Sequence, residues 1–88
     1  MRLSKEKIEK ISEQILGFLY SKSPQALFTY NIATDLARDE EFVKRLLKDL
    51  KQKGLVLEIK KNPKGIAYSR RSRWRLSEQA YHTYKNHQ

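Results

Sequence analysis

The hydrophobic period of the sequence changes at one glycine, Gly54, and this change strongly limits the folds available to the chain. Before it, the segment EEFVKRLLKDLKQK carries apolar residues at helical spacing, with charged residues on the opposite side. Asp39 is a suitable N-cap, acidic residues occupy the first turn, and the glycine provides a stop. Immediately after it, LVLEIKK alternates with the period of two that is typical of a β-strand. A helix over 40–53 is therefore predicted to lead directly into a strand. The apolar side of this helix is formed by Val43, Leu46, Leu47 and Leu50.

Three further helices are predicted around this one. Residues 4–20 carry isoleucines and leucines at three- and four-residue spacing behind a serine cap. Residues 29–37 form a short helix for which Thr29 is the expected N-cap, and the LF dipeptide before it can pair as an edge strand. A last helix over 78–86 follows another serine cap.

The strand after the glycine is expected to belong to a hairpin over 55–76. NPKG is typical of a turn, because Pro63 fixes one backbone dihedral and Gly65 is free to take a positive φ. The returning strand is a β-prone run through Ile66, Tyr68, Trp74 and Leu76. Stacking of the tryptophan on bases, as in single-strand binders, is one interpretation, but packing in the core is the preferred one.

Composition bounds the class of protein. Eighty-eight residues with 39% hydrophobic side chains fit a single domain over 1–88 with one modest core. The absence of cysteine excludes disulfides, thiolate metal sites and cysteine nucleophiles. No apolar run approaches the roughly 20 residues of a membrane span, and the N-terminus lacks a secretory signal, so a cytoplasmic location is expected.

The positive charge is concentrated in the last third of the chain. The net charge is +9, and residues 55–88 contain eight basic and two acidic residues. The stretch KNPKGIAYSRRSRWRL holds six lysines and arginines without an acid. Such a concentration repels itself unless a polyanion offsets it, and it therefore indicates nucleic-acid binding.

The order of these elements, with a short helix joined by a tight turn to a longer one and then a basic hairpin, indicates a helix-turn-helix with a wing. Here the sequence resembles the winged-helix DNA-binding superfamily, in particular its small archaeal and bacterial transcriptional regulators. The resemblance rests on IATDLARDEEFVKRLLKDLKQKGLV and WRLSEQAY, and with the first helix it covers nearly the whole chain. It implies an α+β fold in which a three-helix core carries a two-stranded wing and a C-terminal helix.

The resemblance also implies binding of double-stranded DNA without a cofactor, with the helix over 40–53 in the major groove and the wing on phosphates or in the minor groove. Arg45 is the first candidate for reading bases, because arginine can bond O6 and N7 of guanine together. Tyr30 and Asn31, at the start of the short helix, are candidates for a phosphate contact beside the backbone amides. The remaining predicted contacts are Phe42, Lys44, Lys48 and Gln52 on the helix, and Lys60, Lys61, Lys64, Arg70, Arg71 and Arg73 on the wing.

Two other functions remain open at this point. The same basic hairpin suits structured RNA, and a winged domain can serve as a protein-interaction module. Glu40 and Glu41, which put negative charge at the helix start, and Phe42, where relatives often have Ser or Thr, suit a protein contact.

Catalysis and metal binding find no support in the sequence. There is no Gly-rich phosphate loop, and His82 and His87 are five residues apart, so they face different directions on a helix. Tyr81 and Tyr84 on the last helix have two interpretations. They contribute to a homodimer formed through the first and last helices, or they seal the last helix onto the first within one chain.

Overall fold

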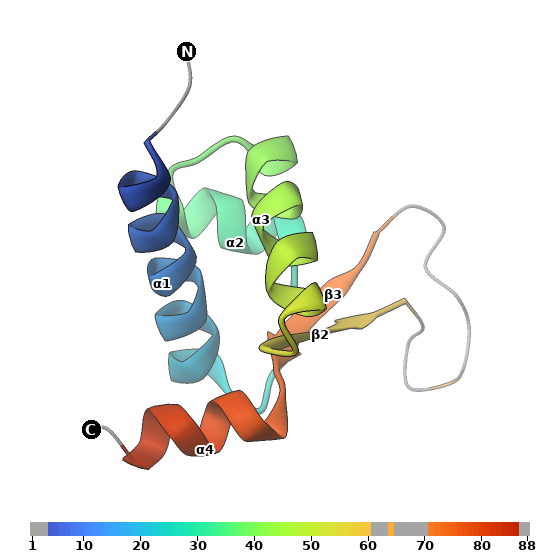
Figure 1. The fold of residues 1–88 in the computed structure, drawn as a ribbon. Helices are drawn as coiled ribbons and strands as arrows, with labels where there is room; N and C mark the ends of the chain where they lie inside the picture. Colours follow the sequence, from blue (N-terminus) through green and yellow to red (C-terminus); the bar gives the residue numbers. More distant parts are fainter. Residues whose placement is uncertain (1–3, 61–63, 65–70, 87–88) are drawn as a thin grey trace.

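The computed structural model of the chain describes residues 4–60, 64 and 71–86 (Figure 1). The amphipathic segments form helices and the alternating segments form strands, in the expected order. In chain order the elements are α1 (Lys5–Lys22), β1 (Leu27–Phe28), α2 (Thr29–Leu36), α3 (Glu40–Gln52), β2 (Val56–Ile59), β3 (Arg73–Leu76) and α4 (Glu78–Asn86).

The three strands form one antiparallel sheet in the order β1-β3-β2. The pairing of Val56 with Leu76 and of Glu58 with Trp74 sets the register between β2 and β3. On the other side of β3, Leu27 pairs with Trp74, so the predicted edge strand is confirmed. The wing pair is thus extended to a three-stranded sheet, and β3 is its central strand.

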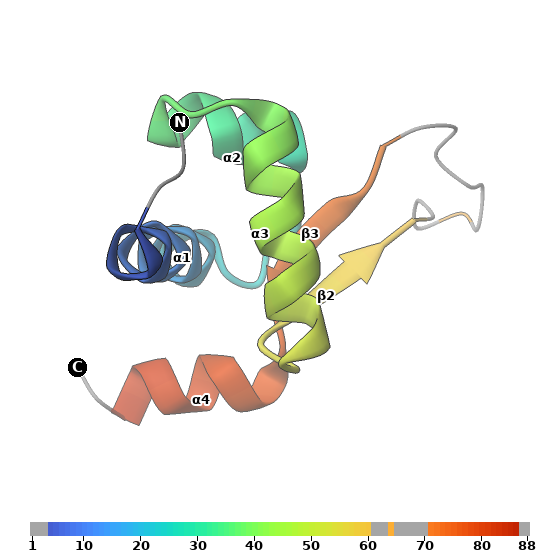
Figure 2. The same cartoon turned by 45° about the horizontal axis from the view of Figure 1, so that its top comes forward.

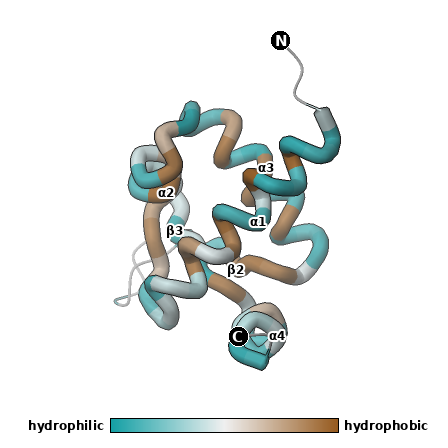
Figure 3. The backbone as a smooth tube through the Cα atoms, turned by 90° about the vertical axis from the view of Figure 1, so that its left-hand side faces the viewer, coloured by the Kyte–Doolittle hydropathy of each residue, from teal (hydrophilic) through white to brown (hydrophobic). Residues whose placement is uncertain are grey.

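The core lies between the sheet and the helices. Apolar side chains from α1, α2 and α3 meet Val56, Trp74 and Leu76 from the inner face of the sheet. In Figure 3, hydrophobic and hydrophilic residues alternate along the helices, as expected for elements that bury one side. Trp74 is 0% exposed, which confirms core packing as its role.

The prediction that Thr29 caps α2 is wrong. Phe28 holds the N-cap position, and Thr29 is the first helical residue, with its hydroxyl accepting a hydrogen bond from Nε1 of Trp74 at 2.8 Å. The indole N–H is buried and must find an acceptor, because an unsatisfied buried donor costs about 1–3 kcal/mol. This long-range contact outweighs local capping.

The remaining helix ends follow local sequence signals. The side chains of Ser4, Asp39 and Ser77 each accept a hydrogen bond from a backbone N–H three residues later, as expected of N-caps. Gly54 ends α3 with a φ of 76°, a conformation that glycine adopts readily. The expected end of α1 at residue 20 is two residues early: the helix continues to Lys22, and only the residue that precedes Pro24 leaves helical dihedrals.

The turn between α2 and α3 is tight. Ala37 has a φ of 53°, and its N–H and that of Arg38 bond back to carbonyls in the last turn of α2. α3 therefore follows α2 closely, which is the helix-turn-helix arrangement.

The sheet strands β2 and β3 extend away from α1 on the far side of α3 (Figures 1 and 2). α4 crosses the other end of the molecule, beside the C-terminal end of α1 (Figure 1). The α+β winged helix-turn-helix fold is confirmed. Within the described residues, none of the helices combines the length and hydrophobicity needed to cross a bilayer.

Candidate nucleic-acid interface

The outer face of α3 is exposed and carries most of the predicted helix contacts. Lys44, Arg45, Lys48 and Gln52 are all exposed, while the apolar residues between them are buried. Phe42 is half-buried and packs against the core, so only part of its ring faces outward. The helix thus presents cations on a rigid element, as a groove-binding helix requires.

A hollow of about 220 Å³ opens beside the N-terminal end of α3. Three predicted contact residues from three separate segments line it: Tyr30 of α2, Lys44 of α3 and Arg71 just before β3. Tyr30 is 62% exposed. The fold therefore brings together residues that lie up to 41 positions apart in sequence. The other lining residues are Phe28, Thr29, Glu40, Glu41 and Ser72.

The hollow also borders the start of α2. No side chain among the described residues caps this helix end, so its first N–H groups lack a side-chain acceptor. Such N–H groups, together with the helix dipole, favour an anion. Asn31 is exposed in the same turn but does not line the hollow.

The base of the wing holds its arginines against an aromatic ring. The guanidinium carbons of Arg71 and Arg73 lie 5.9 Å and 4.8 Å from the centroid of the Phe28 ring. This cation–π contact orients both side chains without neutralising their charge. Lys60 and Lys64 are exposed. The predicted contacts Lys61 and Arg70 lie outside the described residues, so their placement stays a prediction.

Toward the C-terminal end of α3, Glu58 of β2 forms ion pairs with two lysines of the helix. The side chain of Glu58 is 2% exposed, and its Oε1 lies 3.0 Å from Nζ of Lys48 and 2.9 Å from Nζ of Lys51. Oε2 accepts a hydrogen bond from the Ser72 hydroxyl at 2.6 Å. Nζ of Lys48 also lies 5.8 Å from the centroid of the Trp74 ring. We call the group Lys48, Lys51, Glu58 and Ser72 the Glu58 cluster.

Contacts within the Glu58 cluster lower the pKa of the Glu58 carboxyl. Burial of the Glu58 carboxyl acts to raise its pKa, but hydrogen bonds from Ser72, Lys51 and Lys48, with the charge of Lys48, outweigh burial. The net result lowers the pKa from 4.5 to about 2. Glu58 is therefore ionised at neutral pH and holds two lysines of α3.

The sequence alone does not reveal the Glu58 cluster. A signal was present, since Glu58 shares the period-two face of buried Val56 and is an isolated acid among basic residues. Its partners are seven to fourteen residues away in sequence, so only the packing of α3 on the sheet brings them together.

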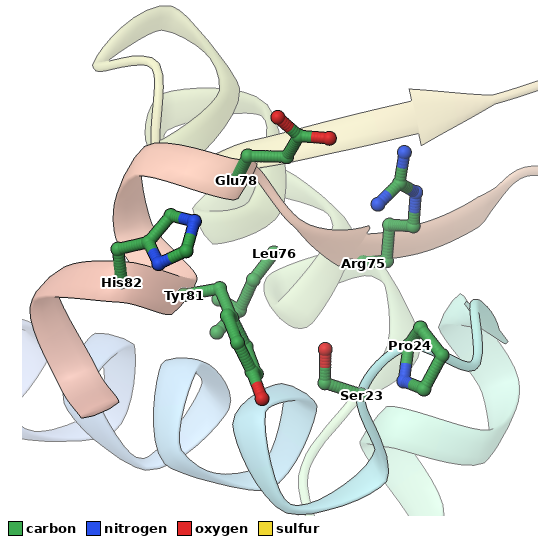
Figure 4. A pocket seen from close by; sticks show the side chains of 7 residues that line it. All are labelled: Ser23, Pro24, Arg75, Leu76, Glu78, Tyr81 and His82. Carbon is green, nitrogen blue, oxygen red and sulfur yellow. The ribbon is translucent and has the colours of Figure 1, made fainter.

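A second hollow, of about 410 Å³, lies at the opposite end of the sheet, between α4 and the end of α1 (Figure 4). Arg75, Tyr81 and His82 line it, and none of the predicted DNA contacts does. Tyr81 and Tyr84 lie with their ring centroids 5.4 Å and 5.5 Å from that of Tyr20. These tyrosines thus pack α4 onto α1 within one chain.

Among residues 4–60, 64 and 71–86, no three acidic or histidine side chains are grouped in a way that would hold a metal ion. The α3 face and the hollow beside it carry exposed cations, an aromatic ring and an uncapped helix start.

No protein-family model and no curated sequence matches the chain. Solved structures do share its fold. A complex of Staphylococcus aureus MepR with DNA has a TM-score of 0.74 at 23% identity, over 93% of this chain and 64% of that chain. MepR in a DNA-binding conformation has a TM-score of 0.69 at 23% identity, over 92% of this chain and 60% of that chain.

A mutant of Lactococcus lactis ZitR in apo form has a TM-score of 0.72 at 26% identity, over 93% of this chain and 57% of that chain. This chain therefore spans less than two thirds of the length of these neighbours. The likeness shows that nearly all of this chain has the winged-helix fold.

Proposed function

We propose that this chain binds double-stranded DNA and acts in transcription regulation, as a winged domain of the kind found in small archaeal and bacterial regulators. The observation that carries the proposal is the hollow at the N-terminal end of α3, where Tyr30, Lys44 and Arg71 come together from three segments of the chain. A hydroxyl, an ammonium and a guanidinium are the groups that proteins use most on the DNA backbone.

In this proposal a phosphate occupies the hollow. Lys44 and Arg71 supply the charge, Tyr30 donates a hydrogen bond, and the N–H groups at the start of α2 complete the contact. A phosphate held there fixes the register of the protein on the duplex. The exposed face of α3 then enters the major groove, and Arg45, one residue after Lys44, reaches base edges.

The wing supplies the sequence-independent part of the affinity. Each phosphate neutralised by a lysine or arginine releases condensed counterions, which makes binding favourable and dependent on salt. Arg71 and Arg73 are oriented for this role by the Phe28 ring, and Lys60 and Lys64 lie exposed on the same hairpin. The predicted contacts Lys61 and Arg70 add to this charge.

MepR offers a precedent, because a structure with nearly the same fold has been solved as a complex with DNA. Regulators of this shape commonly read palindromes as dimers, with half-sites about one duplex turn apart. A homodimer of this chain remains part of the proposal, with the outward sides of α1 and α4 as its contact.

A protein-interaction module is the second candidate function, because Glu40 and Glu41 also line the hollow. Two carboxylates beside two cations make a site of mixed sign, which suits a peptide carrying both charges. DNA binding remains the better interpretation because the hairpin beside the hollow is cationic.

The test is a comparison of ligands at one ionic strength. Duplexes enriched by selection from a random library, random duplexes and a structured RNA are titrated in about 50 mM salt and followed by fluorescence anisotropy. The proposal expects the enriched duplex to bind at least about tenfold more tightly than the random one, and both to bind more tightly than RNA. Tighter binding of RNA, or an absence of binding to any duplex, would contradict it.

A further inference from the structure

DNA binding alone does not explain why two surface lysines of α3 are bonded to the buried carboxylate of Glu58. Lys48 and Lys51 lie on the outer side of α3, where cations are expected to meet DNA, yet both ammonium groups are bonded to one buried carboxylate. Their side chains are 45% and 47% exposed, so they lie at the surface while their charges are engaged.

The ion pairs of Glu58 with the two lysines are strong because the carboxylate accepts several short hydrogen bonds. The carboxylate accepts three charge-assisted bonds from the two lysines, at 2.9–3.1 Å, and a fourth bond from Ser72. Withdrawing either lysine would remove one of the two charges that compensate the buried carboxylate, which is unfavourable. A phosphate must therefore compete with Glu58 for these lysines.

We propose that Glu58 is a positioning residue that determines specificity: it withholds Lys48 and Lys51 from the DNA backbone and holds β2 against α3. The inference rests on the proposed function, and it assigns a role that a DNA-contact list would miss. With these two lysines engaged, the cations of α3 left for DNA are concentrated around Lys44 and Arg45, at the helix end beside the hollow.

The physical consequence concerns the ratio between good and poor sites. Sequence-independent attraction grows with each free cation, whereas base readout does not. A carboxylate that offsets part of the charge of the two lysines therefore lowers the attraction to every duplex by the same factor, which by itself leaves the ratio unchanged. The ratio depends on the second effect of Glu58: it holds β2 against α3 and so keeps the wing at one angle to the recognition helix, which lets Arg45 reach the bases while the wing meets phosphates.

A purely architectural role predicts something different. If Glu58 only tied β2 to α3, weakening the tie would loosen the wing and reduce affinity for all duplexes. Glu58→Gln separates the two roles, because the amide keeps the size of the side chain and an acceptor for Ser72 but removes the charge that holds the lysines.

The experiment measures affinity for random and enriched duplexes over a salt series with Glu58→Gln. Glu9→Gln, an exposed change of the same charge on α1, is the matched control. We expect Glu58→Gln to bind random duplex about tenfold more tightly at low salt, with a slope of log affinity against log salt steeper by about one to two. The ratio between enriched and random duplex is expected to fall, and the control to match the wild type within about twofold.

A second pair of variants tests the mechanism. Replacing both lysines, Lys48→Gln with Lys51→Gln, is expected to change the salt slope of the wild-type chain by less than about 0.5 but to abolish the gain in the Glu58→Gln background. A slope that drops by about two in the otherwise wild-type chain would show that these lysines already meet phosphates, and the inference would be overturned. If Glu58→Gln does not fold, Lys51→Gln alone decides the matter, because it leaves Lys48 bonded to Glu58: a slope that drops by about one would again overturn the inference.

Failure of the inference differs from failure of the proposed function. If the wild type binds duplex DNA but Glu58→Gln behaves like Glu9→Gln, or weakens on all duplexes with an unchanged slope, the inference fails alone. If the wild type binds no duplex, the proposed function fails, and urea unfolding still tests the cluster. A double-mutant cycle between Glu58 and Lys48 is then expected to show a coupling of about threefold or more in the unfolding constant, and additivity would refute it.

Discussion

Lys44 and Lys48 lie one turn apart on the exposed face of α3, yet their surroundings differ. Lys44 lines an open hollow with Tyr30 and Arg71 and makes no ion pair among the described residues. Lys48 is bonded to both oxygens of Glu58 and lies over Trp74. Exposure alone therefore does not identify a binding cation: Lys44 is available to an external anion, whereas Lys48 is already paired with Glu58.

The prediction with the largest effect concerns Glu58, whose contribution to stability is present near neutral pH and is lost in acid. Because the pKa of Glu58 is lowered to about 2, the carboxylate stabilises the folded state fully above about pH 4.5, and this contribution is lost as the pH falls toward about 2. Near neutral pH, Glu58→Gln is therefore expected to lower the free energy of unfolding by on the order of 2 kcal/mol, allowing for screening at the half-exposed lysines. Urea unfolding at a series of pH values measures this, and a difference that does not shrink in acid would contradict it.

The next largest effect concerns the hollow beside the N-terminal end of α3. Lys44→Ala combined with Arg71→Ala is expected to weaken binding to random and enriched duplexes alike by about 30-fold at low salt, because two phosphate contacts are removed. Lys7→Ala with Lys10→Ala, two exposed lysines of α1, removes the same charge away from α3 and serves as the control. Equal losses in both double variants would show that net charge, rather than the hollow, governs binding.

Arg45→Ala separates the readout of bases from the sequence-independent attraction to the DNA backbone. Its loss is expected to narrow the ratio between enriched and random duplexes about tenfold, since a bidentate contact to guanine contributes roughly 1–3 kcal/mol of discrimination. Lys53→Ala, an exposed change just beyond the C-terminal end of α3, is expected to leave the ratio unchanged. If Arg45→Ala binds measurably with the ratio intact, α3 does not read bases.

The smallest effect concerns Ala37, in the turn between α2 and the N-terminal end of α3. Ala37 has a φ of 53°, which L-residues other than glycine adopt at a cost of about 1 kcal/mol. Ala37→Gly is expected to raise the free energy of unfolding by about 0.5–1 kcal/mol without changing DNA affinity, because it touches neither lysine. Thermal unfolding measures the first quantity and anisotropy the second; a lower melting temperature would contradict the account of the turn.

Local sequence signals predicted the elements well where the cause was itself local. The cap at Asp39, the stop at Gly54 and the period change between them depend on neighbouring residues, and each is present in the structure. The burial of Trp74 followed from its place in an alternating strand. The end of α1 was missed by two residues because the influence of Pro24 reaches back only one position.

Contacts between distant segments were not predictable in the same way. Thr29 has the residue type of a cap, but the indole of Trp74, 45 residues away, takes its hydroxyl as an acceptor. Lys48 has the position of a base-reading residue, but Glu58 engages it once α3 packs on the sheet. Spacing along a helix identifies a face, whereas only the tertiary structure shows which charges on that face are already engaged.

That cations beside α3 and on the wing bind the DNA backbone is tested by the salt dependence of binding to a random duplex. The account predicts measurable affinity in dilute buffer and a log–log slope of about −3 to −5, as expected for several phosphate contacts. A slope near zero, or no binding even in dilute buffer, would contradict it.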